Sequence, residues 1–307
     1  MKLEPLVSII LPSFNAEIYL QTTIQSLLAQ TYKNIEILFI DDGSTDKSED
    51  VVYGFKSSKI NYYKIKHAGI PKAINYGISK ARGELIAIQD ADDCSHPDRI
   101  EKQVEYLSNN LSVSMVGTSI AYFTNSINKT WKVFFPTNHN QIISELNKFN
   151  YAISHPSIMF RNKALPCPLY PLNEEFLPDY CMIINYSKKF LISNVDQIFY
   201  YVRISETSFT QNNLKQIVYQ GYQRYRKPDR TIAYNFRRFL FYASVYHYKK
   251  GLFYFLNNNF LYIPFFLLSA ISNPSKVFGH FKKKFKHHNI LRFFQNRARH
   301  HNTIEKI

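Results

Sequence analysis

The sequence has few cysteines and no leader-like segment, and each absence excludes a class of protein. Its three cysteines (Cys94, Cys167 and Cys181) are widely spaced and form no CxxC pair, so neither a disulfide framework nor a zinc site is expected. A reducing compartment such as the cytosol suits them best. No signal peptide is expected, because Glu4 and Pro5 follow directly on the first three residues.

A long uninterrupted apolar run is also missing. The best candidate for a membrane span, Leu252–Ile271, contains Asn257–Asn259 and Pro264. Its apolar remainder, Phe260–Ile271, has 12 residues, whereas a helix needs about 20 to cross a bilayer. The GxGxxG loop typical of dinucleotide-binding folds is absent as well. A membrane span and a dinucleotide-binding site are therefore disfavoured.

Positive charge is abundant but unevenly distributed. The formal net charge is +15, yet residues 211–307 hold 18 of the 38 Lys and Arg and only two of the 23 acidic residues, Asp229 and Glu305. The first 210 residues are close to neutral. We therefore expect a catalytic domain over residues 1–210, followed by a basic, aromatic and largely helical extension over residues 211–307.

The first 120 residues alternate strand-length apolar runs with helical periodicity. Strands are predicted at Val7–Leu11, Ile35–Ile40, Ile60–Ile65, Leu85–Ile88 and Val113–Ile120. Helices are predicted around residues 20–28, 46–56, 70–81 and 97–108, the last with Pro97 in its first position. This alternation indicates an α/β fold with a doubly wound, mostly parallel, Rossmann-like sheet. Ligands of such sheets bind at the carboxyl ends of the strands.

Two acidic runs lie at predicted strand ends. Asp41–Asp46 follows the second strand, where it could form a turn with Asp46 capping the next helix, or could bind a nucleobase or ribose. Asp90, Asp92 and Asp93 follow the fourth strand. Three acids within four residues repel one another unless a cation lies among them. Oxygen ligands suit magnesium or manganese, which would neutralise a diphosphate leaving group.

Four blocks in order carry a family resemblance. They are Val7–Asn15, Asp41–Asp46, Ala73–Glu84 and Asp90–Asp93. At this spacing they resemble family 2 glycosyltransferases of the GT-A fold, of the bacterial cell-surface glycan type, and the resemblance covers roughly residues 6–210. It implies a nucleotide-sugar half over residues 1–120 and an acceptor half over residues 121–210. The proline-punctuated segment after residue 120 suits loops that build an acceptor pocket.

The resemblance also implies roles for individual residues. By similarity, Pro12 and Asp42 contact the base, Asp41 and Asp90 support the nucleotide pocket, and Asp92 and Asp93 hold ribose and metal. Without the resemblance, the residue types indicate only a group of acids at strand ends that binds a cation.

Family 2 enzymes invert the anomeric centre, and this needs a carboxylate to remove the acceptor proton. The matching segment makes Asp179 the candidate base, although Pro178 stands where the family usually has Glu. Asp179 could instead be a helix cap, and Glu174 or Glu175 could matter in its place. His155 matches a block on the acceptor side and could equally be structural. Arg203 is expected to position the chain.

The chain departs from processive members of the family. Gln223 and Arg226 match the start of their Gln-x-x-Arg-Trp motif, but Lys227 follows, and Trp131 is the only tryptophan. A single-addition enzyme is favoured. Lys249, Lys250 and the lysines at 282–284 and 286 flank or follow the apolar stretch, which is typical of segments that lie in an anionic membrane interface. A helical extension packed on the catalytic domain is the alternative.

The expected reaction is transfer of a hexose from a nucleotide diphosphate sugar, with UDP the expected nucleotide, to a glycan precursor hydroxyl. The acceptor is expected to be lipid-linked or at the cell surface, and the enzyme peripheral on the inner face of the cytoplasmic membrane. Two alternatives stay open. One is a relative that binds nucleotide sugar without turnover, and the other is a protein that binds nucleic acid through its basic tail. No nucleic-acid partner is expected, because the acidic clusters would repel phosphates.

Overall fold

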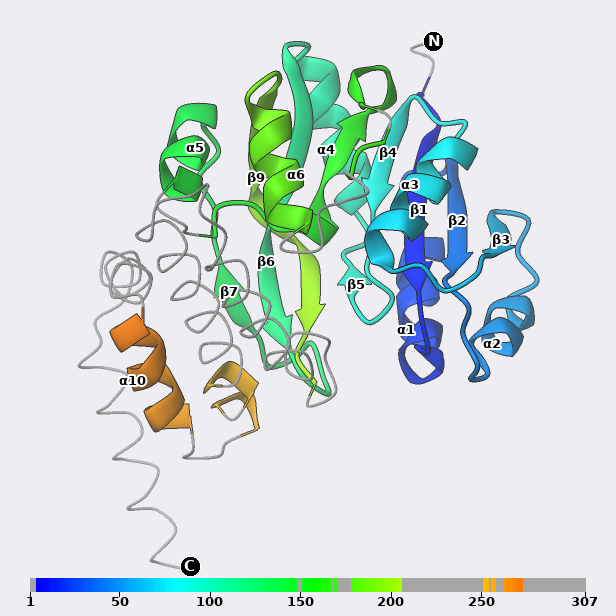
Figure 1. Cartoon of the computed structure of the whole chain (residues 1–307), viewed down its shortest axis with the longest axis horizontal. Helices are drawn as coiled ribbons and strands as arrows, with labels where there is room; N and C mark the ends of the chain where they lie inside the picture. Colours follow the sequence, from blue (N-terminus) through cyan, green and yellow to red (C-terminus); the bar gives the residue numbers. More distant parts are fainter. Residues whose placement is uncertain are drawn as a thin grey trace, which may run out of the picture. The chain divides into compact units, whose positions relative to one another are not determined.

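A computed structural model describes residues 4–147, 151–166, 168–170, 178–205, 251–253, 255–257 and 262–272. The chain divides into two compact units, Met1–Ser208 and Phe209–Ile307. The first unit is built on one mixed sheet with helices on both faces (Figure 1).

The described strands form a sheet in the order β3-β2-β1-β4-β8-β6-β9-β5, with β7 paired to β6. Strands β1 to β4 are Val7–Ser13, Ile35–Asp41, Ile60–Lys64 and Leu85–Ile88. Strands β5 to β9 are Cys94–Ser95, Val113–Phe123, Trp131–Val133, Met159–Arg161 and Leu191–Arg203. The first four are mutually parallel, as are β6 and β9, whereas β8 runs antiparallel between β4 and β6.

Helices of the first unit cover both faces of the sheet. They are α1 Glu17–Leu28, α2 Ser48–Gly54, α3 Ile70–Lys80, α4 Arg99–Asn109, α5 His139–Asn147 and α6 Pro178–Ser187. Two 3-10 turns, η1 His155–Ser157 and η2 Asn162–Ala164, flank β8. Alternate residues of β1 supply the two cores: Ile10 packs on the side of α3, α5 and α6, while Ile9 and Leu11 pack on the side of α1, α2 and α4.

The five predicted strands are all present, and each predicted helix has a counterpart. The predicted start of the fourth helix was wrong: α4 begins at Arg99 rather than at Pro97. The Pro97 carbonyl accepts a hydrogen bond from Thr31 N at 2.9 Å, and Arg99 N donates to the His96 carbonyl at 3.0 Å. A tight turn therefore precedes the helix and anchors the loop between α1 and β2.

The second unit is described only in part. Helix α10, Tyr262–Ser272, covers the second half of the apolar segment singled out above and contains no charged residue. Pro264 falls in its first turn, where a missing N–H costs no helical hydrogen bond. Among the residues that the structure describes, no helix is long and apolar enough to cross a membrane. Gln223, Arg226 and the basic residues around residues 249 and 282 lie outside the described residues.

Candidate active site

The predicted nucleotide residues gather where β1, β2 and β4 end. Because these strands are parallel, their carboxyl ends share one edge of the sheet. Pro12 is buried there, in register with Ile40 of β2. A proline inside a sheet normally breaks a ladder, but β4 pairs with β1 only as far as Ile10, so no partner strand needs the missing N–H.

Asp41 is fully buried, and its carboxylate is bound by neighbouring residues. One oxygen accepts the backbone N–H of Ser44 at 2.7 Å, and the other accepts the Tyr62 hydroxyl at 2.5 Å. Lys64 Nζ lies 3.8 Å from the second oxygen. The turn predicted for this run is therefore present. Burial, together with the Asp41 contact, raises the pKa of Tyr62, which keeps that hydroxyl a donor.

Asp42 ties the second strand to the loop after the third. Its oxygens accept the backbone N–H groups of Ala68 and Gly69 at 2.7 and 2.9 Å, and His67 Nδ1 lies 2.9 Å from one of them. The side chain is 2% exposed. Gly43 has a φ of +79°, and a Cβ there would lie 3.0 Å from the His67 backbone nitrogen, so glycine is required for the close approach.

An aromatic pair borders this carboxylate. The rings of Phe14 and His67 stack with centroids 4.2 Å apart, and both side chains are exposed. His67 is not among the site residues predicted from the sequence. Its position could have indicated it, because His67 lies three residues beyond the carboxyl end of β3, where ligands of such sheets bind.

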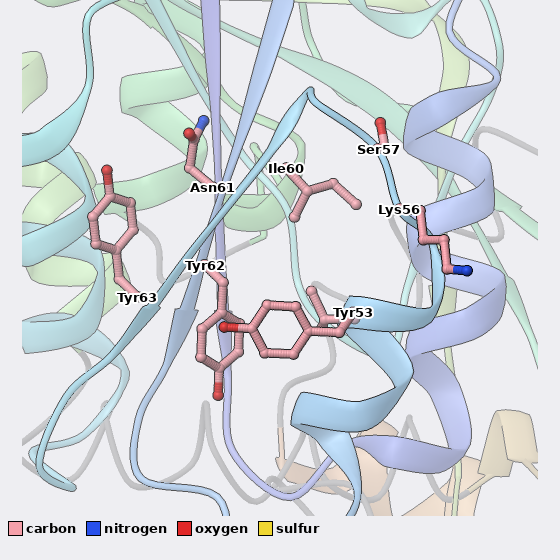
Figure 2. A pocket seen from close by; sticks show the side chains of 8 residues that line it. Tyr53, Lys56, Ser57, Ile60, Asn61, Tyr62 and Tyr63 are labelled. Carbon is pink, nitrogen blue, oxygen red and sulfur yellow. The ribbon is translucent and has the colours of Figure 1, made fainter.

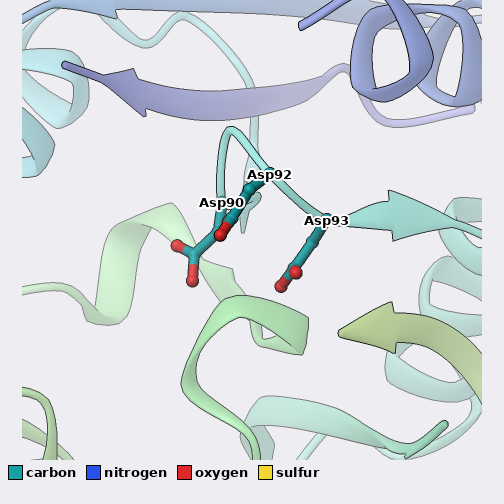
Figure 3. Close-up of side chains that lie close together, drawn as sticks. All are labelled: Asp90, Asp92 and Asp93. Atoms are coloured by element: carbon teal, nitrogen blue, oxygen red, sulfur yellow. The ribbon is translucent and has the colours of Figure 1, made fainter. Parts of the chain in front are cut away.

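The acidic cluster forms the turn between β4 and β5 (Figure 3). Asp90, Asp92 and Asp93 each present a carboxylate oxygen within 4.8 Å of the others. Asp93 is buried, and the other two are partly exposed. Burial, and then the charges of Asp92 and Asp90, raise the pKa of Asp93 well above its ordinary value. Three close oxygen ligands with one destabilised charge fit a hard divalent cation, which would relieve the repulsion.

Arg203, the last residue of β9, holds this turn in place through hydrogen bonds. Its backbone N–H donates to Asp93 Oδ1 at 2.8 Å, and its Nε donates to the Asp92 carbonyl at 2.8 Å. A third bond runs from Nη1 to the Thr124 carbonyl at 3.1 Å. These contacts agree with the prediction that Arg203 positions the chain.

A second arginine, Arg99, lies completely buried behind the turn. Its guanidinium donates to Gln89, Ser95 and Gln103 and to the carbonyls of Ile88 and Pro156, at 2.8–3.2 Å. Its five N–H groups therefore all have acceptors. Burial lowers the pKa of Arg99 to about 10, so it stays charged at neutral pH. The contact with Pro156 joins the acidic turn to η1, which carries His155.

On the predicted acceptor side, Asp179 lies in the first turn of α6 with a 53% exposed side chain. Its Oδ2 is 3.9 Å from Nδ1 of buried His155, and His155 Nε2 is hydrogen-bonded to the hydroxyl of Tyr170. The charges of Asp179 and Asp90 both raise the pKa of Tyr170, after burial. The candidate base and the acidic turn therefore both act electrostatically on the same phenol. Glu174 and Glu175 lie outside the described residues.

A separate pocket of about 540 Å³ opens between α2 and the edge strand β3 (Figure 2). Its lining includes Tyr53, Tyr62 and Lys56 and none of the predicted site residues. Tyr62 nevertheless connects it to the site, because the hydroxyl of this residue binds Asp41.

The fold is similar to that of several solved structures. The chain is similar to Staphylococcus aureus TarS 1–349 in complex with UDP, at 18% identity and a TM-score of 0.55, covering 89% of this chain and 82% of that one. It is also similar to the mannosyltransferase PcManGT of Pyrobaculum calidifontis in complex with GDP-Man and Mn²⁺, at 14% identity and a TM-score of 0.54, covering 96% and 84%. These similarities show that the sheet and its acidic edge have the GT-A fold.

Sequence comparison gives the family. The model of glycosyl transferase family 2 matches residues 8–166, just over half of the chain. This chain belongs to glycosyl transferase family 2, as the resemblance predicted.

Curated relatives agree with the family. An uncharacterized glycosyltransferase of Rickettsia conorii is 33% identical over 205 residues, covering 65% of this chain and 33% of the relative. One of Methanocaldococcus jannaschii is 32% identical over 170 residues, covering 53% and 58%. The matches to the curated relatives span less than two thirds of those proteins, down to 15%.

Proposed function

We propose that this enzyme transfers a hexose from a nucleoside diphosphate sugar, preferably a UDP sugar, to an acceptor hydroxyl with inversion. The observation that carries the proposal is the convergence of Asp90, Asp92 and Asp93 at the same sheet edge as Asp41 and Asp42. Such an edge suits a ligand with a nucleoside at one end and a diphosphate at the other. TarS in complex with UDP and PcManGT in complex with GDP-Man are fold neighbours whose ligands support this choice.

The nucleoside is proposed to bind over β1 and β2. The exposed rings of Phe14 and His67 offer a face on which a base can stack. Pro12 and Asp42 lie beside them at the strand ends, and Asp41 holds the turn through Ser44 and Tyr62. Because both Asp42 oxygens already accept backbone hydrogen bonds, its part in base binding would use the remaining lone pairs or a shift of the loop at 67–69.

A divalent cation, Mn²⁺ or Mg²⁺, is proposed at the acidic turn, held by Asp92 and Asp93 with Asp90 beside them. When bound, it would neutralise charge on the diphosphate leaving group. Manganese is present in the complex of the neighbour PcManGT, which supports a cation of this kind. Arg203 and Arg99 hold the turn that presents the three carboxylates.

Asp179 is proposed as the general base. The acceptor O–H gives its proton to the carboxylate while the acceptor oxygen forms a bond to the anomeric carbon. The bond from that carbon to the diphosphate oxygen breaks on the opposite face, and its electron pair leaves with the diphosphate. Exposure of Asp179 leaves an oxygen open to an incoming hydroxyl.

Paired substitutions test this assignment by separating binding from turnover. Asp179→Asn is expected to lower transfer or donor hydrolysis by at least about 100-fold, the scale of a general base, while UDP affinity in Mn²⁺ stays unchanged. Asp92→Ala is expected to remove the Mn²⁺ dependence of UDP binding, measured by titration calorimetry. Full activity of Asp179→Asn would refute the base, and an unchanged Mn²⁺ response in Asp92→Ala would refute that ligand.

The acceptor is proposed to be a glycan precursor, lipid-linked or at the cell surface, reached at the inner face of an anionic membrane. Helix α10 supports this, because Ile263, Leu267 and Leu268 are 49%, 60% and 43% exposed on an uncharged helix. The unit that contains it carries the basic excess of the chain. Apolar side chains inserted among lipid headgroups, with basic residues beside them, are typical of interfacial segments.

A further inference from the structure

His155 lies between a phenol and a carboxylate. It is 5% exposed, its Nε2 is hydrogen-bonded to the Tyr170 hydroxyl, and its Nδ1 is 3.9 Å from Asp179 Oδ2. The three side chains come from η1, from the short segment at 168–170, and from α6. They therefore bring together elements that are separated along the sequence.

Tyr170 is held firmly in this arrangement. Its side chain is completely buried, and its backbone is bound twice by Asn75 of α3. The Asn75 amide donates to the Tyr170 carbonyl at 2.9 Å, and the Tyr170 N–H donates to Asn75 Oδ1 at 3.0 Å. Asn75 belongs to the family-like block Ala73–Glu84. This pair of hydrogen bonds therefore gives that block a structural role on the acceptor side.

A Tyr170 hydroxyl that donates to Nε2 would fix which nitrogen of His155 carries hydrogen. Burial and the charges of Asp179 and Asp90 raise the pKa of Tyr170 well above its ordinary value, so the hydroxyl keeps its proton. When it donates to Nε2, that nitrogen is the acceptor, and the neutral ring carries its hydrogen on Nδ1. Nδ1 is the nitrogen that faces Asp179.

We propose that Tyr170 and His155 are positioning residues for the base: Tyr170 sets the ring of His155, and His155 Nδ1–H orients the carboxylate of Asp179 toward the acceptor hydroxyl. The inference rests on the proposed function, because it takes Asp179 as the base. His155 accepts no proton during transfer. The proton of the acceptor moves to Asp179, whose exposed carboxylate returns it to solvent.

Two substitutions of His155 test whether its Nδ1–H orients Asp179 or whether its ring only fills space. Asparagine can place an amide N–H near the position of Nδ1, whereas glutamine can place one only near Nε2. We expect His155→Gln to lower kcat about 100-fold, within the contribution of a general base, and His155→Asn to retain at least about tenfold more activity than His155→Gln. The KM for the donor should change less than about twofold in both.

Tyr170→Phe removes only the hydroxyl. It should lower kcat about tenfold, the effect of losing one hydrogen bond worth about 1.4 kcal/mol, again with little change in KM. Tyr186→Phe is the matched control: Tyr186 is also a buried tyrosine of this core, and its hydroxyl donates to the Ser114 carbonyl at 3.3 Å. This control should keep the wild-type kcat.

The assay is nucleoside diphosphate release with Mn²⁺ and water as the acceptor, from the more active donor of UDP-N-acetylglucosamine and GDP-mannose. Equal rates for His155→Asn and His155→Gln, or a wild-type rate for Tyr170→Phe, would overturn the inference. If Tyr170→Phe does not fold, the His155 pair decides alone. If Asp179→Asn is inactive while Tyr170→Phe and His155→Gln are fully active, only this inference is wrong. If Asp179→Asn is fully active, the proposed base itself is wrong.

Discussion

Asp93 and Arg99 are buried ionisable residues in neighbouring elements. The surroundings of Arg99 stabilise its charge, whereas those of Asp93 destabilise its charge. Arg99 has an acceptor for every N–H group and a Tyr200 ring 4.7 Å away, so its charge is stabilised by neutral groups. Asp93 receives the Arg203 N–H but faces two further carboxylates. The carboxylates of the acidic turn therefore repel one another, and a bound cation would relieve this repulsion.

Asp93→Asn is expected to stabilise the cation-free protein. The amide oxygen can still accept the Arg203 N–H, and the repulsion is removed. At pH 7 in EDTA, we expect the Tm to rise by about 3 °C, the scale of 1 kcal/mol in a domain of this size. Because the folded protein raises the pKa of Asp93, it binds that proton more tightly than the unfolded chain does, so wild-type stability should increase as pH falls from 7 to 5. The advantage of the variant should shrink over the same range.

The control is Asp196→Asn, at an exposed acid of β9, which should leave the Tm unchanged. A lower Tm for Asp93→Asn than for wild type at pH 7 without metal would contradict this interpretation of the turn.

At the residue scale, strand-end acids were predictable because parallel strands bring their carboxyl ends together. Their partners were not. Tyr62, Arg99 and Tyr170 reach the site from elements that no local pattern relates to it, and each acts through a contact more than ten residues distant in sequence. The predicted roles of Pro12, Asp41, Asp42 and Asp179 remain predictions, although their places in the fold are now defined.

Among the elements, the packing of α3 on β1 is tight enough to require glycine. A Cβ on Gly77 would lie 2.6 Å from Ile10 Cγ2 and 3.2 Å from Ile40 Cγ1. Helix propensity favours alanine by about 1 kcal/mol, but both contacts are with buried core side chains, which have little room to move.

We therefore expect Gly77→Ala to lower the free energy of unfolding by about 1–3 kcal/mol, the usual cost of overpacking a core, measured by urea denaturation. Gly54 provides the matched control, because nothing lies within 4 Å of a Cβ built there. Gly54→Ala should be neutral or slightly stabilising. Gly77→Ala as stable as wild type would show that β1 and α3 can separate without cost.

The elements of the nucleotide half were predictable because buried parallel strands are continuous apolar runs. The acceptor half was not, since β8 is a short strand of three residues and β9 carries polar residues along its length. Strand β8 lies antiparallel between β4 and β6 through pairings distant in sequence, and no local periodicity encodes them. Only α6 was anticipated in this half, from the segment that contains Asp179.

At the scale of the whole molecule, a near-neutral catalytic unit is joined to a basic one. We expect the full chain to sediment with anionic phosphatidylglycerol vesicles and much less with phosphatidylcholine vesicles, and to be released by salt. Leu267→Asp on the exposed face of α10 should weaken this binding about tenfold, because it removes an apolar side chain that would insert among the lipids and adds a charge that the anionic surface repels.

Leu111→Asp, at a 78% exposed leucine of the catalytic unit, is the control and should bind vesicles like wild type. Equal binding to both kinds of vesicle, or preferential binding to single-stranded oligonucleotides, would contradict the proposed membrane partner.

The most direct test of the central claim is a donor panel with the intact protein. UDP-glucose, UDP-galactose, UDP-N-acetylglucosamine and GDP-mannose would each be incubated with Mn²⁺ or EDTA, and nucleoside diphosphate release measured. We predict release from at least one donor, preferably a UDP sugar, that depends on Mn²⁺ and disappears in Asp92→Ala and Asp179→Asn. No release from any donor, together with no donor-dependent rise in Tm, would contradict a glycosyltransferase that uses nucleotide sugars.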